Sequence, residues 1–312
     1  MPAPIKWRSK ILLFKLEATY GADATPTGAA NGILATEVKL TPMEGQDVSR
    51  DLETPWLGAQ PTIPADLHAK LSFRVELEPS GTAGTAPAWG GLIRACAMAE
   101  TIVAATSVTY NPVTDAHESG TFYLWLGATL QKIKGARGNC MLKVDASGIP
   151  YLEFEFTGLW AAPEEAARDT PTLTGFEKPQ VASNANTPGF TVGATPLVLR
   201  SFQLDFGNQV EPRFLIGAEN VVITDKAEAI QMTVEAVPLT TLDPFALAAS
   251  QAATALELVH GTTAGRIVTL AVPAMQMQRP QAPQQAQGIV EWPLRAVPLP
   301  QAGNDQFTLT LT

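Results

Sequence analysis

Few residues in this chain have the types and spacing that enzyme chemistry requires. Its 312 residues include three histidines, His68, His117 and His260, and none stands at a spacing typical of a metal or catalytic partner. The sequence contains no HExxH, CxxC or GxSxG motif and no phosphate-binding or dinucleotide-binding glycine pattern. We therefore expect no enzyme activity, no cofactor and no metal site, and we interpret His68 as a surface histidine on a strand.

Two groups of carboxylates are the remaining candidates for chemistry. Glu153 and Glu155 alternate along one strand and share a face, and a carboxylate pair can hydrolyse a glycosidic bond. A second group in the segment 41–64 could offer oxygen ligands to Ca²⁺ and comprises Glu44, Asp47, Asp51 and Glu53. Neither group has a diagnostic spacing, and Arg50 lies inside the second. We favour a solvated acidic row for the first and a solvated or salt-bridged loop for the second.

The composition describes a folded chain with little charge. Lys and Arg number 21 and Asp and Glu number 30, which gives a net charge of −9. This balance argues against tight nucleic-acid binding, which needs a basic face. Charged residues make up 16% of the chain, against about 25% in ordinary soluble domains. The low charge predicts a surface that is polar but uncharged, or one that is hidden in an assembly.

The two cysteines and the apolar segments carry little further information. Cys96 and Cys140 could pair, but we favour two free, semi-buried thiols. The most apolar stretch is 91–105, which Arg94 and Glu100 interrupt and which is shorter than the roughly 18 residues of a membrane span. We expect no membrane insertion and no secretory signal at the N-terminus.

Strict alternation of apolar and polar residues predicts a mainly β (α+β) fold built from antiparallel sheets with one solvated face. The longest alternating segment is 67–78, and shorter ones are 151–157, 201–206 and 230–236. Further strands are expected at 33–40, 122–134, 139–145, 267–272, 289–297 and 307–311. Two short helices are expected, one over about 88–99 and one that starts at Asp243-Pro244, an N-cap residue followed by proline.

The two halves of the chain repeat a weak pattern. Val75-Glu76 and Val234-Glu235 each end an alternating strand and are followed by a proline, at Pro79 and Pro238. About ten residues later each half has an aromatic residue that opens a short helix. The other matching positions are Lys39-Leu40 with Gln203-Leu204, and Gly148-Ile149 with Gly288-Ile289. We favour duplication of one module over chance similarity between two β-rich halves.

These patterns divide the chain into four parts. Residues 1–32 are expected to form an N-terminal arm with a short apolar strand at 11–16, and 33–160 a first β module. Residues 161–196 are rich in Pro, Asn and Thr and read as a linker or extended arm, and 197–312 form a second module. The long loop 41–64 carries Trp56, Leu57 and Ile63, which predicts a contact with another subunit.

Several segments of the first half resemble the major tail tube proteins of long, non-contractile-tailed (siphovirus-like) bacteriophages. The segments are 6–15 (KWRSKILLFK), 17–28 (EATYGADATPTG), Arg50-Asp51-Leu52 with Trp56-Leu57-Gly58, and the alternating strand that runs into 77–84 (LEPSGTAG). The resemblance covers about 6–160 well and is faint afterwards. It implies two tandem β-sandwich or barrel-like tail tube modules, each with a short flanking helix. It further implies that six modules form a ring and that stacked rings form a tube through which the genome passes.

The same resemblance implies the location and partners of the chain. The expected location is the virion tail, assembled in the host cytoplasm. The expected partners are other copies of this chain, the tail tip or baseplate, tape measure and tail terminator proteins, and double-stranded DNA in transient passage. The acidic balance suits a DNA conduit, because a wall that does not hold phosphate lets the duplex slide.

Duplication predicts how many chains make a ring. If the halves are duplicates, six modules need three chains, which predicts a trimeric ring with pseudo-sixfold symmetry. The alternative is a hexameric ring with the second half as an outer decoration domain. A rival of another class is a carbohydrate-binding β-sandwich of a decoration or receptor-binding protein, although the six tryptophans are dispersed along the chain rather than clustered.

Two sets of residues are expected to serve assembly and DNA passage. The lumen-facing candidates are polar residues on strands: Lys70, Arg74, Glu76, Glu153, Glu155, Gln231, Glu235 and Glu291. The candidates for contacts between rings or subunits come from the arm and the long loop: Trp7, Leu13, Phe14, Arg50, Asp51, Leu52, Trp56 and Leu57.

Overall fold

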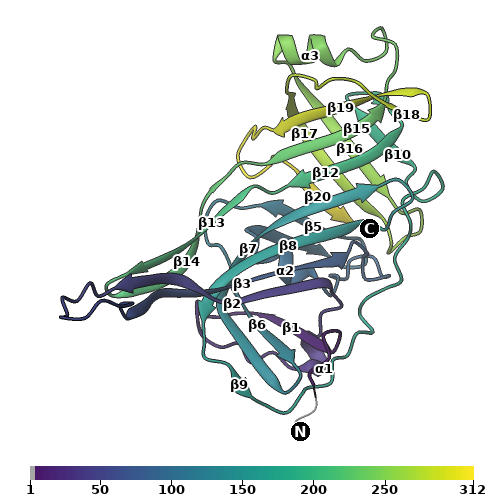
Figure 1. Cartoon of the computed structure of the whole chain (residues 1–312). Helices are drawn as coiled ribbons and strands as arrows, with labels where there is room; N and C mark the ends of the chain where they lie inside the picture. The colour runs from purple at the N-terminus through teal and green to yellow at the C-terminus, as the bar shows by residue number, and fades with distance from the viewer. Residues whose placement is uncertain (1–3) are drawn as a thin grey trace.

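The computed structural model describes residues 4–312 as a two-layered β-structure from which two hairpins project (Figure 1). The mainly β fold predicted from the alternation is confirmed. The described residues form 20 strands and three short helices, α1 (Gly28–Asn31), α2 (Gly90–Arg94) and α3 (Pro244–Ser250). None of these helices is long and apolar enough to span a membrane.

One antiparallel sheet, here called the broad sheet, runs along the whole molecule. Its strand order is β2–β3–β8–β7–β12–β15–β19, and the short strand β18 pairs with the start of β19. The bounds are β2 (Thr36–Ser49), β3 (Thr62–Glu76), β7 (Thr129–Asp145), β8 (Tyr151–Trp160), β12 (Leu199–Asp205), β15 (Ala229–Glu235), β18 (Gln284–Ala286) and β19 (Ile289–Pro298). Strands of both halves of the chain therefore share one sheet.

The second layer covers the apolar face of the broad sheet. One part has the order β4–β5–β20–β17–β16–β10–β11, and the other pairs β1 with β6 and β6 with β7. The bounds are β1 (Lys10–Leu16), β4 (Met98–Val103), β5 (Ser107–Pro112), β6 (Gly120–Leu126), β10 (Gly189–Val192), β11 (Thr195–Pro196), β16 (Ala253–His260), β17 (Val268–Met277) and β20 (Thr308–Leu311). The two-residue strand β9 (Glu164–Glu165) pairs with the start of β7.

Two long strands carry the chain from one layer to the other. The first part of β7 pairs with β6, and its last part pairs with β8 and β12. The pairing of β7 with β8 shifts between Lys134 and Arg137, and Gly135 there has φ +58°, a conformation that favours glycine. Strand β17 behaves alike, because it pairs with β16 and β20 in one layer and with β19 in the other.

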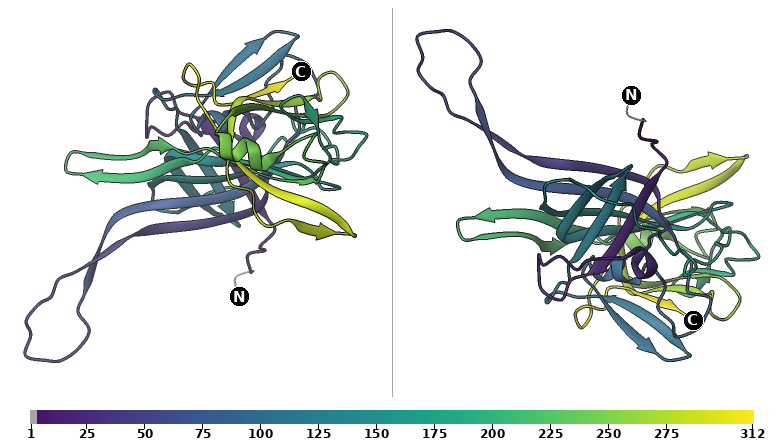
Figure 2. Two further views of the ribbon diagram at one scale, coloured as in Figure 1. Left: turned by 90° about the horizontal axis from the view of Figure 1, so that it is seen from above. Right: turned by 90° about the horizontal axis from the view of Figure 1, so that it is seen from below.

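Two hairpins extend beyond the sheets on the same side of the molecule (Figure 2). The segment 41–64, expected as a loop, is instead the outer part of the β2–β3 hairpin, which stays paired as far as Ser49 and Thr62. The second hairpin joins β13 (Asn208–Leu215) to β14 (Ala218–Lys226). Its base continues the pairing of β12 with β15, so β12–β13 and β14–β15 together correspond to β2 and β3.

The two halves repeat one set of strand pairings. The pairs β1–β6, β2–β3, β3–β8, β6–β7 and β7–β8 recur as β10–β16, β12–β15, β15–β19, β16–β17 and β17–β19. The registers also agree with the sequence repeat. Aligning Val75 with Val234 and Gly148 with Gly288 makes Thr233 and Pro293 the counterparts of Arg74 and Glu153. Arg74 pairs with Glu153, and Thr233 pairs with Pro293.

Parts of the expected arm and linker belong to the sheets. Residues 10–16 form β1, which pairs with β6 along its whole length, so this stretch is not a free arm. Residues 189–192 of the expected linker form β10, the counterpart of β1. The second set of pairings therefore starts near 189 rather than at 197. Residues 1–3 of the arm lie outside the described residues.

The first helix is shorter than the sequence predicted, and the second begins as predicted. Helix α2 ends at Arg94 because Ala97, with φ +57°, turns the chain into β4. Helix α3 starts after Asp243, whose carboxylate accepts hydrogen bonds from the backbone N–H groups of Phe245 and Ala246, both at 2.9 Å.

The core between the layers is continuous through both halves. In the first half it contains Phe14, Phe73, Phe122, Phe154 and Phe156, and the Phe14 and Phe122 ring centroids lie 4.6 Å apart. In the second half it contains Phe190, Phe202 and Phe206. The prediction of two free cysteines is confirmed, since Cys96 and Cys140 are buried in this core and unpaired.

Candidate functional site

The outward face of the broad sheet gathers the eight lumen candidates on one surface. In an antiparallel sheet, residues that pair directly lie on the same face. Ser72 pairs with Glu155, and Glu155 with Asn139 on the neighbouring strand. Rows of paired residues that join four or five neighbouring strands include Arg74–Glu153–Met141–Asp205–Ala229, Lys39–Ser72–Glu155–Asn139 and Tyr151–Lys143–Gln203–Gln231–Arg295. Lys70, Glu76 and Glu235 lie on this same face, and Glu291 lies on it as well but is only 5% exposed.

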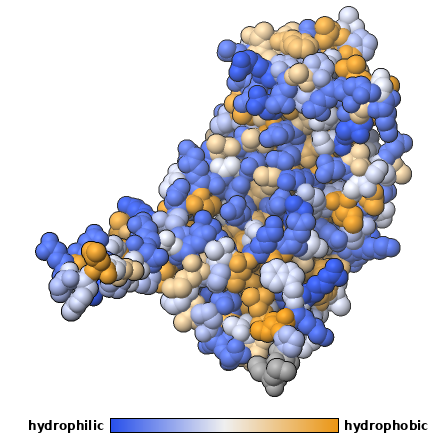
Figure 3. Space-filling model, viewed as in Figure 1, coloured by the Kyte–Doolittle hydropathy of each residue, from blue (hydrophilic) through white to orange (hydrophobic). Residues whose placement is uncertain are grey.

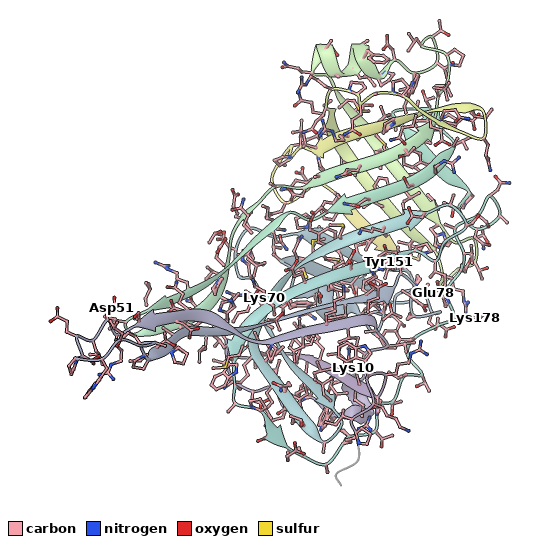
Figure 4. The ribbon with its side chains drawn as sticks, in the orientation of Figure 1. Lys10, Asp51, Lys70, Glu78, Tyr151 and Lys178 are labelled. Atoms are coloured by element: carbon pink, nitrogen blue, oxygen red, sulfur yellow. The ribbon has the colours of Figure 1, made fainter. Side chains whose placement is uncertain are left out.

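The opposite face of the same strands is apolar and buried. Leu71, Phe73 and Val75 of β3 are at most 1% exposed, and the alternate residues of β7, β8, β12, β15 and β19 are buried with them. The sheet is therefore amphipathic across both halves of the chain, with its polar side turned outward. This outward side is mainly hydrophilic in Figure 3, and Figure 4 marks Lys70 and Tyr151 on its strands.

Ion pairs connect neighbouring strands across this polar face. The Arg74 guanidinium donates to Glu37 at 2.5 Å and to Glu153 at 3.2 Å, and the Lys143 ammonium donates to the other Glu153 oxygen at 2.7 Å. The Tyr151 ring lies 4.8 Å from the Arg74 guanidinium. Burial opposes ionisation of Glu153, but the hydrogen bonds and charges of Lys143 and Arg74 hold its pKa below the usual range. This direction is opposite to what a glycosidase general acid requires.

Other cations near this face are paired as well. Lys70 donates to Glu44 at 2.7 Å, and this bond lowers the pKa of the Glu44 carboxyl. Arg200 donates to both oxygens of Glu291 at 2.5 and 2.6 Å. The face also has a hollow of about 430 Å³ lined by uncharged and charged polar groups, among them Lys143, Gln203, Gln231 and Arg295. The result is a surface rich in polar groups on which carboxylates already neutralise most of the cations.

The carboxylates of the segment 41–64 are spread along the β2–β3 hairpin. Among residues 4–312 no group of three or more His, Cys, Asp and Glu side chains is placed to hold a metal ion. Glu44 pairs with Lys70, and Asp51 accepts a hydrogen bond from Ser49 at 2.7 Å. These residues lie along the β2–β3 hairpin, whose tip Figure 4 marks at Asp51.

The predicted contact residues separate into two groups in the structure. Trp56 and Leu57 stand at the tip of the β2–β3 hairpin with exposed fractions of 77% and 106%, beside the exposed Arg50, Asp51 and Leu52. Trp7 is exposed at the N-terminal end, where Lys10 lies over its ring. Hydrophobic side chains at the projecting tip are visible in Figure 3.

Leu13 and Phe14 are not surface residues. They are 0% and 5% exposed because β1 lies in the second layer, where both of its faces are covered. Leu13 packs with Tyr123 and Trp125, and Phe14 joins the main core. Their assignment to subunit contacts is therefore corrected to core packing.

Sequence reasoning missed the second projecting hairpin, β13–β14. Its tip exposes Leu215 at 53% and Ile216 at 110%. Gly217 follows with φ +94°, the conformation that closes the turn. The apolar run Phe214-Leu215-Ile216 directly before a glycine is the sequence signal that could have identified it.

The base of this second hairpin is fixed to the first half of the chain. The Asn208 amide donates to the carbonyl oxygens of Cys96 and Gly138 at 2.8 and 3.0 Å. Arg137 donates to the Val221 carbonyl at 2.8 Å, and the Tyr20 hydroxyl accepts from the Val221 N–H. The second hairpin therefore has a base that is hydrogen-bonded to the first half of the chain and apolar side chains that are exposed at its tip.

Comparison with known proteins identifies the family. A search of curated proteins found no match. The family model described as phage tail tube protein matches residues 7–305, which span both halves, the broad sheet and both hairpins. The chain therefore belongs to the phage tail tube protein family.

Proposed function

We propose that three copies of this chain form a ring, and that stacked rings form the tube that conducts double-stranded DNA from the capsid to the host. Membership in the family makes the chain a structural component of the phage tail that assembles with itself. The main support for three copies per ring is the broad sheet. Its two halves repeat one strand order side by side and share one polar face.

The number of strands favours three copies. Counting β18 as the counterpart of the end of β7, each chain supplies eight strands to the sheet, so three copies supply about 24. With strands about 4.8 Å apart and tilted by about 40°, such a barrel is roughly 45–50 Å across at the backbone. That width admits a duplex with its lining side chains. Six copies would double it and leave the duplex far from the wall.

The shared sheet also argues against an outer decoration domain. A decoration domain would lie outside the wall, with its own edges, whereas β12 of the second half pairs directly with β7 of the first. We therefore assign residues 10–160 to a first tail tube module and about 189–312 to a second. The segment between them joins the modules and crosses from one to the other.

The polar face of the broad sheet is the proposed lining of the bore. It carries Lys70, Arg74, Glu76, Glu153, Glu155, Gln231, Glu235 and Glu291. DNA binding becomes tight when free Lys and Arg replace the counterions of the phosphates. On this face Arg74, Lys143 and Lys70 are already paired with carboxylates, so the wall offers the duplex few such contacts and lets it slide.

The two hairpins are the proposed contacts between successive rings. They project on the same side of the sheet and end in exposed apolar residues, Trp56 and Leu57 on one and Leu215 and Ile216 on the other. Removal of residues 45–60 should leave a folded chain that no longer forms tubes. Tubes of normal length from that variant would show that the first hairpin is not a stacking element.

The remaining expectations concern the surroundings of the tube. We propose a siphovirus-like, non-contractile tail, with tail tip or baseplate and tail terminator proteins at its ends and a tape measure protein in its bore. We propose that the tail assembles in the host cytoplasm before it joins the capsid. All of these partners would contact the ring edges or the polar face described above.

Electron microscopy of the purified chain, with rotational classification of end-on views, tests the proposal. Rings of three copies with six similar lobes are expected. Six copies per ring would overturn the trimer and retain the tube. A monomer that never assembles at any concentration would overturn the tube function and favour a carbohydrate-binding module.

A further inference from the structure

The junction between the two halves within one chain is a continuous pairing of strands. Strand β7 pairs with β12 from Met141–Asp205 to Asp145–Ser201. Backbone hydrogen bonds extend it at both ends, from Phe206 N–H to the Cys140 carbonyl and from Ala146 N–H to the Arg200 carbonyl, at 3.0 and 2.8 Å. The chain therefore shows how the second module joins the first.

The counterpart of β12 in the first module is β2, which pairs with no strand other than β3 among the described residues, although the Lys10 ammonium donates to the Val38 backbone carbonyl of β2 at 2.6 Å. The aligned dipeptides Lys39-Leu40 and Gln203-Leu204 fix the correspondence, because Lys39 pairs with Ser72 as Gln203 pairs with Gln231. Phe202 and Leu204 are 1% and 0% exposed behind the junction. Their counterparts Val38 and Leu40 are apolar but only partly buried. The edge of β2 thus resembles half of the β7–β12 junction.

The counterpart of the end of β7 is the segment that leads from β17 into β18. Met275 near the end of β17 pairs with Pro298 of β19, as β7 pairs with β8. The segment then continues along β19, with Gln278 N–H bonded to the Arg295 carbonyl at 2.8 Å and Gln284 opposite Glu291. In the same way Lys143 lies opposite Tyr151. Gln284 therefore corresponds to Lys143.

The outer edge of this segment is also unpaired in the described part of the chain. Residues 281–285 are exposed, and Ile289 and Val290 beside them are each 49% exposed. Strands β2 and β18 lie at opposite ends of the broad sheet, so they cannot pair within one chain (Figure 1). Unpaired strand edges are templates for pairing with another chain.

We infer that β18 of one copy pairs with β2 of the next in the register of the β7–β12 junction. Gln284 then lies opposite Lys39 of the neighbouring copy, and Ala286 opposite Glu37. The inference rests on the proposed function, because it names the surface through which copies meet within a ring. The contact is head to tail, and its repetition gives a ring when the rotation between copies closes, here after the three copies of the proposed function. It also makes the sheet continuous around the bore.

The register can be tested by cysteine cross-linking between two single variants. Lys39→Cys and Gln284→Cys chains are mixed under assembly conditions and oxidised, so that a 39–284 disulfide must join different copies. The native thiols do not compete, because burial raises the pKa values of Cys96 and Cys140 and neither thiol is exposed. Thr41→Cys mixed with Gln284→Cys is the matched control, since Thr41 is exposed on the same face of β2 two residues away.

The expected result is a covalent dimer that forms at least tenfold faster with Lys39→Cys than with Thr41→Cys. Equal rates, or no dimer while micrographs of the same sample show rings or tubes, would overturn this junction and leave the proposed function standing. If the unmodified chain forms no ring at any concentration, the proposed function fails, and the inference fails with it. Circular dichroism of each variant alone checks that these exposed positions leave the fold unchanged.

Discussion

The protonation of Glu78 should control the stability of the contact between the two modules. This carboxyl follows β3, is 5% exposed, and faces the loop that joins β16 to β17. Its Oε1 lies 3.9 Å from Arg266, which pairs more closely with Glu177 of the connecting segment. The Gly81 N–H donates to the Gly265 carbonyl at 3.1 Å in the same contact. Burial raises the pKa of Glu78 to about 7, because the Gln180 N–H and the Arg266 charge offset only part of the desolvation.

The direction of the effect follows from this pKa. The folded chain holds the Glu78 proton up to about pH 7, whereas the ordinary pKa is 4.5. Below pH 4.5 Glu78 is neutral in both the folded and the unfolded chain, so its ionisation does not reduce the free energy of unfolding. As the pH rises from 4.5 through 7, the unfolded chain loses this proton first, and the free energy of unfolding decreases. A difference of about 2.5 units corresponds to about 3 kcal/mol at 1.36 kcal/mol per unit. Glu78→Gln removes the titration, so the variant should exceed the natural chain in unfolding free energy by about 3 kcal/mol at pH 8 and differ little at pH 5.

Urea unfolding at pH 5 and pH 8, followed by tryptophan fluorescence below the concentration of assembly, measures this difference. Comparing variant with natural chain at each pH cancels the other groups that titrate in the range, including His117 and His260, whose pKa values burial lowers. Glu53→Gln, at an exposed hairpin position, is the matched control and should change neither value. A Glu78→Gln chain whose unfolding free energy depends on pH as strongly as that of the natural chain would refute the reasoning.

Three further predictions concern folding and assembly. Asp243→Ala removes both N-cap hydrogen bonds of α3 and should lower the unfolding free energy by about 1 kcal/mol, measured by urea unfolding with Asp243→Asn as the conservative control. Phe156→Ala empties a fully buried position and should lower it by about 3–5 kcal/mol, and a loss below about 1 kcal/mol would contradict the core described here. Leu57→Ser and Ile216→Ser should leave thermal unfolding unchanged but slow tube formation in light scattering, and unaltered tube formation by both variants would exclude the hairpin tips from ring stacking.

The sequence predicts those strands that have one wet and one dry face. Alternation from Leu67 to Leu77 identifies the inner part of β3, because one face of this part is apolar and buried and the other is polar and solvated. It fails for the outer part of the β2–β3 hairpin, since both faces there are solvated and β2 is exposed at most of its positions. It fails in the opposite way for β1, whose consecutive residues Ile11, Leu12, Leu13 and Phe14 are all buried. Such an apolar run predicts the short strand at 11–16, but without alternation it does not show that the strand pairs within a sheet whose two faces are both covered.

The polar face could be predicted only one strand at a time. Alternation shows that Glu153 and Glu155 share a face, but it does not show which strand lies beside theirs. The pairing of Arg74 with Glu153 and of Lys143 with Gln203 depends on long-range register, which the core and the β7–β12 junction determine. The sequence repeat nevertheless contained register information, because its aligned positions pair with one another in the structure.

The differences between the two modules have a consequence for stacking. Equivalent modules would give a ring with six equal hairpins, and successive rings could then dock in six equivalent rotations. In this chain the strands of the first hairpin are joined through residues 50–61 and those of the second through residues 216–217, so the first hairpin reaches further (Figure 2) and the two have different apolar tips. A trimer therefore presents long and short hairpins in alternation, and a ring turned by one module would set long hairpins where short ones fit. In the proposed trimer, divergence of the two modules would keep a six-module bore for DNA and would reduce the docking of rings to three equivalent rotations.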